Sequence, residues 1–221
     1  MSERTQSLRS LVAQHWADAG RFFERAAPEL GKPLGVGFRA LFASVPRRLG
    51  ASADERPFSS AAAELGALAR PHWSLGDYTR AALVSAALDQ LPEAEQPGFV
   101  LQLFEAGEMG EQVSLLRTLT LLPGPERFVE VGLQACRANA LDVFEAMVCE
   151  NPFLALHFPP LNFNQAVMKA IFQGVSVRRI EGLETRITPE LQRMAAGYAS
   201  ERRAAGRPVP VDVDYITQYG A

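Results

Sequence analysis

The chain has 221 residues, of which 48% are hydrophobic, and this is enough to bury a sizeable core unaided. Its 22 basic and 25 acidic residues leave a net charge of -3, which gives no overall electrostatic reason to expect nucleic acid as a partner. We expect neither a secretory signal nor a membrane span, because the first residues are polar and no window approaches ~18 consecutive apolar residues. The two cysteines, Cys136 and Cys149, form no disulfide framework, so the sequence predicts a cytoplasmic protein.

Helical periodicity begins near the N-terminus. Leu8, Leu11 and Val12 start a series of apolar residues at three- and four-residue steps, which predicts one helix over residues 5–27. A second apolar stretch covers residues 34–45. Turn formers and charges then fill residues 46–58, where we expect a linker or long surface loop. A short alanine-rich helix should follow near residues 59–69.

The middle of the chain predicts a series of short helices. The segment Ser74-Leu75-Gly76-Asp77 matches a capping box, which marks the start of a helix. Further helices should carry Phe99, Leu115, Val129 and Phe144. Because these helices are short and evenly spaced, they must pack on their neighbours. The sequence therefore predicts an all-α fold with little or no β structure, an antiparallel helical array resembling an α-solenoid of the HEAT or TPR kind.

The last third begins with an unusual segment, residues 151–160, which is rich in aromatic residues and bounded by prolines. It cannot be helical throughout and is too apolar to lie in water, so we expect an ordered, buried loop. A helix should follow over residues 162–173. The last long helix should begin with Thr188 as its N-cap and Pro189 at its first position. Only residues 209–216 show alternation that could form a strand.

The expected organisation has four parts. Helices occupy residues 1–45, the loop or linker residues 46–58, the main helical-array domain residues 59–208, and a C-terminal tail residues 209–221.

Motifs for catalysis, metal binding and nucleotide binding are not recognisable in the sequence. The histidines lie far apart, and none has a second ligand at metal-binding spacing. The lone Gly35-Val36-Gly37 follows no predicted strand. We therefore expect no metal and no cofactor. The pairs His15-Trp16 and His72-Trp73 could line an apolar pocket, although a tryptophan serving as a core anchor is the simpler interpretation.

The helix predicted at 162–173 carries the best candidate site. Its narrow polar stripe could line a groove or face solvent, whereas Asn164 falls in the apolar row of Met168 and Phe172. A structural alternative is that the amides and Lys169 brace the preceding loop. The charged residues that follow, 178–186, are typical of a solvated face with i,i+3 pairs. The candidate ligand or partner site comprises His157, Phe158, Asn162, Asn164, Gln165, Lys169 and Gln173.

Several ordered motifs resemble the EboA family. They are Asn151-Pro-Phe, His157-Phe-Pro, Asn164-Gln-Ala-Val-Met-Lys-Ala, Arg179-Ile-Glu-Gly-Leu and Thr188-Pro-Glu-Leu. The resemblance covers roughly residues 73–208, with Phe163 where the family is expected to have tryptophan. It implies an accessory protein associated with trafficking of secondary metabolites. The implied gene neighbourhood also encodes a prenyltransferase-like membrane protein, a sugar-phosphate-cyclase-like enzyme and hydrolase-like proteins.

Three functions are compatible with these observations. The first is a non-enzymatic scaffold or carrier for an apolar metabolite or for other proteins of the ebo cluster. The second is a small enzyme with a site around His157, Asn164 and Lys169. The third is a membrane-peripheral adaptor for the prenyltransferase-like partner, which could use exposed apolar surface or the basic pairs Arg47-Arg48 and Arg202-Arg203.

Overall fold

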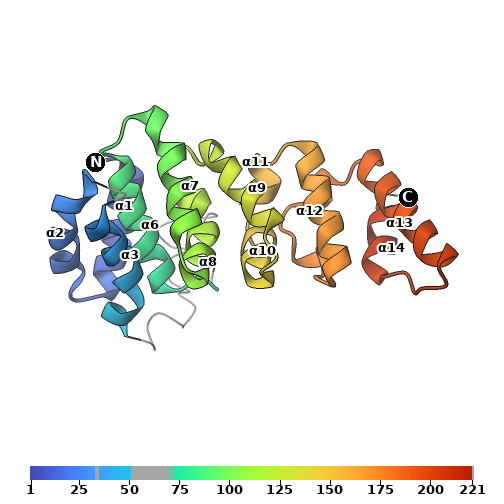
Figure 1. Cartoon of the computed structure of the whole chain (residues 1–221), viewed down its shortest axis with the longest axis horizontal. Coiled ribbons are helices and arrows are strands. Elements are labelled where there is room, and N and C mark those ends of the chain that lie inside the picture. The colour runs from blue at the N-terminus through green and yellow to red at the C-terminus, as the bar shows by residue number, and fades with distance from the viewer. Residues whose placement is uncertain (33–34, 51–69, 71, 221) are drawn as a thin grey trace. The chain divides into compact units, whose positions relative to one another are not determined.

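The structure is a computed structural model that describes residues 1–32, 35–50, 70 and 72–220 (Figure 1). In these ranges the chain forms twelve α-helices, connected by turns and short 3-10 helices, and no strand. The all-α prediction is therefore confirmed for the described residues, while the regular stacking of an α-solenoid stays a prediction. Within the same ranges, no helix has both the length and the apolar character needed to cross a bilayer.

The chain divides into two compact units, Met1–Ala146 and Met147–Ala221. The helices of the first unit are α1 (Glu3–His15), α2 (Ala19–Leu30), α3 (Val36–Leu49), α6 (Leu75–Leu88), α7 (Gln96–Ala106), α8 (Met109–Thr118) and α9 (Val129–Arg137); α10 (Leu141–Val148) crosses the boundary. Those of the second unit are α11 (Phe153–His157), α12 (Pro160–Gln173), α13 (Pro189–Ala204) and α14 (Val211–Thr217).

The first unit is built around α6, whose residues are all buried and which packs against α1, α2, α3 and α8. The predicted capping box starts this helix. The Ser74 hydroxyl accepts from the Asp77 amide at 3.1 Å, and the Asp77 carboxylate accepts from the Ser74 amide at 2.8 Å. A buried hydroxyl pair, Thr5 and Ser85 at 2.6 Å, ties α1 to α6. Helices far apart in the sequence therefore form one core.

The single helix predicted for residues 5–27 is wrong. The chain leaves the helix at Trp16, whose φ of -136° and ψ of 109° are extended, and a new helix begins after Asp18. The break brings the rings of Trp16 and Phe22 to 5.1 Å, so an aromatic contact accompanies the break in the helix.

The proposed linker lies largely outside the described residues. Its first residues, Pro46 to Leu49, belong to the last turns of α3, which ends at Gly50 with a φ of +81°. The rest of the expected loop and the helix expected near residues 59–69 fall in the range 51–69, which is not described. The predicted division of the chain into domains stays a prediction.

The C-terminal residues close the second unit as a helix, so the strand considered for residues 209–216 is wrong. Val213 and Ile216 are buried at helical spacing. The Asp212 carboxylate accepts from the Val177 amide at 3.1 Å, and the Gln192 side chain on α13 donates to the Ile216 and Tyr219 carbonyls at 3.3 and 3.0 Å. These bonds hold α14 against α13 and against the segment that contains Val177.

Candidate ligand-binding groove

The segment predicted as a buried loop is ordered and contains the one-turn helix α11. Phe153, Leu154 and Phe158 are buried, whereas Leu156 is 61% exposed. The Asn151 side chain accepts from the Phe153 amide at 3.0 Å, which starts the turn. The segment is therefore anchored along one side and open along the other.

Arg186 fastens this segment to α12. Its guanidinium donates to the Ala155 carbonyl and, at 2.8 Å, to the Phe158 carbonyl, and it lies 4.5 Å from the centroid of the Phe163 ring. Carbonyls at the end of a helix have no partner within the helix, so a cation is well placed there. Arg186 thus braces the loop before α12, a role that the sequence analysis considered for Lys169 and the amides.

The charged side chains of the run 178–186 are largely exposed, as their pattern predicted, but three of their contacts are not the local i,i+3 pairs that were expected. Arg179 pairs with Glu150 at 2.8 Å, the Arg178 guanidinium lies 4.2 Å from the Tyr215 ring centroid, and the Tyr215 hydroxyl donates to Glu184 at 2.7 Å. These partners are distant in sequence. The run therefore connects elements of the second unit.

The predicted site residues are spread over two helices and differ in burial. His157 ends α11, is half-buried and has its ring 4.8 Å from that of Phe153. On α12, Asn164 is buried, at 4% exposure. The remaining predicted residues are the buried Phe158, the half-buried Asn162 and Lys169, and the exposed Gln165 and Gln173.

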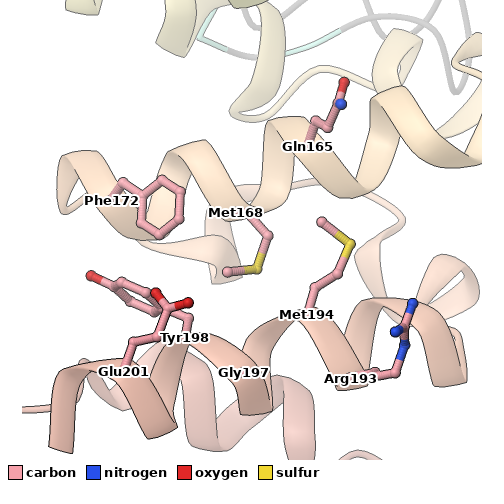
Figure 2. Close-up of a pocket in the computed structure, with 8 residues that line it drawn as sticks. All are labelled: Gln165, Met168, Phe172, Arg193, Met194, Gly197, Tyr198 and Glu201. Atoms are coloured by element: carbon pink, nitrogen blue, oxygen red, sulfur yellow. The ribbon is translucent and has the colours of Figure 1, made fainter. Parts of the chain in front are cut away.

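A groove of about 410 Å³ lies between α12 and α13 (Figure 2). Its lining residues come from facing sides of the two helices: Gln165, Met168, Phe172, Arg193, Met194, Gly197, Tyr198 and Glu201. Such a volume falls within the range of small-molecule sites.

The middle and one end of the groove are apolar. Met168 is 5% exposed and Met194 is half-buried, and Figure 2 shows their side chains directed into the space between the helices. Phe172 is 59% exposed, and its ring lies 4.7 Å from that of Tyr198 at an interplanar angle of 70°. Thioethers and aromatic edges together form an adaptable apolar surface.

Gly197 leaves the groove open on the α13 side. It lies inside the helix Pro189–Ala204, yet a Cβ built on it would meet no atom within 4 Å. Glycine in a helix interior is about 1 kcal/mol less favourable than alanine. Alanine would fit the open space at this position, and glycine places no side chain in this part of the groove wall.

The polar residues lie toward the ends of the groove. Arg193 is engaged by Glu190 at 2.6 Å, while Glu201 lines the groove toward the end that holds Phe172 and Tyr198. In Figure 2 the Gln165 amide points away from the two methionines. Arg193 and Glu201 are eight residues apart on α13, which is about 12 Å along the helix axis.

Sequence reasoning found only one of the lining residues, Gln165. It treated Met168, Phe172, Met194 and Tyr198 as parts of apolar helix faces. The sequence does contain a pattern that indicates the groove. One face of the last long helix, at i, i+3, i+4, i+7 spacing, combines apolar residues with a glycine and a charge: Met194, Gly197, Tyr198 and Glu201. The other predicted site residues do not line this groove, and their role in binding stays a prediction.

Outside the groove, the described residues give little support for a metal site or for membrane contact through the basic pairs. Among the described residues, no three His, Cys, Asp or Glu side chains cluster as metal ligands would. Of the basic pairs, Arg48 lies over the Phe22 ring at 5.8 Å, and Arg202 donates to the Pro208 carbonyl at 3.0 Å. Both arginines therefore have contacts within their own unit.

Comparisons with curated proteins and with solved structures gave no match. The sequence profile of one family, described as metabolite traffic protein EboA, matches residues 29–216. The matched range includes every residue of the groove and more than half of the chain. Together with the ordered motifs from Asn151 to Leu191, the match shows that this chain belongs to the EboA family.

Proposed function

We propose that this protein is a non-enzymatic carrier that holds an apolar metabolite, or its precursor, in the groove between α12 and α13. The observation that carries the proposal is the groove itself, about 410 Å³ in volume and lined by two methionines and an aromatic pair, with no side chain at Gly197. The family description, metabolite traffic protein, supports a role in handling such a molecule.

The chemistry of the lining favours binding over catalysis. Thioethers and aromatic rings bind through contact area, and they dominate the groove. The lining includes one carboxylate, Glu201, but no serine, cysteine or histidine that it could activate. His157, Asn164 and Lys169, on which an enzymatic function would depend, are not among the lining residues.

The test is a pair of tryptophan variants. Gly197→Trp should fill the groove and weaken binding of a neutral apolar dye, Nile red, by about tenfold or more. The matched control is Gly98→Trp on α7, because a Cβ there also meets no atom within 4 Å. The dye is titrated with the wild-type full chain and with each variant, and its fluorescence reports binding.

Equal dye binding by the wild type and Gly197→Trp would refute the proposal. So would equal weakening by Gly98→Trp, because the loss would then not belong to the groove. Circular dichroism checks that both variants keep their helices.

A further inference from the structure

We infer that the ligand of the groove is an aromatic amine, a flat ring system with a protonated nitrogen at the Glu201 end. This inference rests on the carrier function proposed above and adds the chemical class of the ligand. It depends on the distribution of charge along the groove and on the shape and polarisability of its walls.

The charged lining residues Arg193 and Glu201 lie toward opposite ends of the groove. Arg193 is neutralised by Glu190, with an N to O distance of 2.6 Å, so that end carries little net charge. The other end presents the Glu201 carboxylate, and Tyr198 lines the groove one helical turn before it. A carboxylate attracts a cation, and the ammonium group of a ligand can donate a hydrogen bond to it.

The Tyr198 ring already accepts one cation. The Arg202 guanidinium lies 5.9 Å from its centroid while donating to the Pro208 carbonyl at 3.0 Å. A hydrogen bond to backbone thus holds this arginine, and the Glu201 carboxylate remains in the groove lining. A ligand nitrogen can therefore approach Glu201 from the groove.

The middle of the groove suits an aromatic ring. Methionine sulfur makes favourable contacts with aromatic rings, and Met168 and Met194 supply a sulfur from each wall. Gly197, between Met194 and Tyr198 in the lining, lets a flat molecule approach the α13 backbone without meeting a Cβ. The Phe172 ring, 59% exposed, adds a further aromatic surface. About 12 Å between Arg193 and Glu201 suits two or three fused or linked rings.

Four probes separate the two parts of the inference. They are 2-naphthylmethylamine, 2-naphthylmethanol, octylamine and octanol, which combine an aromatic or aliphatic body with a charged or neutral head. Each is titrated into the full chain at neutral pH and followed by ligand-observed NMR. We expect the aromatic amine to bind about five- to tenfold more tightly than the aromatic alcohol, and also more tightly than octylamine.

The variant Glu201→Gln tests whether the Glu201 carboxylate causes the preference for the amine. This exposed substitution should reduce the preference for naphthylmethylamine over naphthylmethanol to about twofold or less. Glu126→Gln, an exposed glutamate of the first unit, serves as the control and should leave the preference unchanged. A preference that survives in Glu201→Gln would overturn the inference.

The remaining outcomes distinguish the inference from the carrier function. If the alcohol binds as tightly as the amine, or octylamine as tightly as the aromatic amine, the ligand class is wrong while the carrier function stands. If no probe binds and Nile red does not distinguish Gly197→Trp from the wild type, the carrier function fails and the inference with it.

Discussion

Substitution by alanine should have opposite effects on stability at Gly197 and at Gly174. Gly197 has helical surroundings and open space, so Gly197→Ala should raise the free energy of unfolding by about 0.5–1 kcal/mol. Gly174 ends α12 with a φ of +75°, a conformation that alanine rarely adopts, so Gly174→Ala should lower it by about 1 kcal/mol. Urea denaturation measures both. A loss of stability in Gly197→Ala would contradict the view that this glycine serves the groove alone.

Arg186 is expected to matter for stability more than its partial exposure suggests. Arg186→Ala removes two charge-assisted hydrogen bonds to the carbonyls of Ala155 and Phe158 and the stacking on Phe163, so we expect a loss of about 2 kcal/mol. Arg186→Lys should recover little, because an ammonium group cannot reproduce the planar fork.

The comparison for Arg186 is Arg193→Ala. Arg193 forms an exposed i,i+3 pair with Glu190, and its removal should leave stability nearly unchanged. Thermal and urea unfolding of the two variants should therefore differ clearly. Similar losses would mean that Arg186 is an ordinary surface arginine.

At the scale of elements, a pH-dependent contact helps to hold α14. The hydrogen bond from the Tyr215 hydroxyl lowers the pKa of the Glu184 carboxyl, and the same bond raises the pKa of Tyr215. Because the carboxyl pKa is lowered in the folded state, the contact stabilises the fold at pH values above the ordinary pKa of 4.5. This stabilisation is lost as the pH falls through the folded pKa. Because the phenol pKa is raised in the folded state, the contact stabilises the fold at pH values below the ordinary pKa of 10.0. This stabilisation is lost as the pH rises through the folded pKa.

Tyr215→Phe should therefore be less stable than the wild type near neutral pH, and the difference should shrink as the pH falls through the folded pKa of Glu184. Both groups are mostly exposed, so after discounting for solvent screening we expect a difference of at most about 0.5 kcal/mol. Unfolding curves of both proteins across the pH range test this. A difference that persists unchanged at low pH would assign the effect to packing.

At the scale of the whole molecule, the two compact units should respond separately to local damage. Arg186→Ala acts within Met147–Ala221, so amides of α11 and α12 should exchange faster with solvent. The buried amides of α6, in Met1–Ala146, should keep their protection. Native-state hydrogen exchange measures both sets in one experiment. Faster exchange throughout the chain would indicate a single cooperative unit.

Helices with local signals were predictable from the sequence, because a capping box or an N-cap acts within a few residues. Ser74 and Thr188 both cap the helices expected of them. The break at Trp16 has no proline and no interruption of the apolar pattern, so periodicity alone runs through it. The groove depends on which faces of α12 and α13 meet, and that pairing is a tertiary property.

The two thioethers also make the groove sensitive to oxidants. Conversion of Met168 or Met194 to the sulfoxide would place a polar, chiral S=O group among apolar walls, which disfavours an apolar occupant. A carrier lined in this way would release its cargo under oxidative stress and regain its capacity after enzymatic repair by methionine sulfoxide reductases.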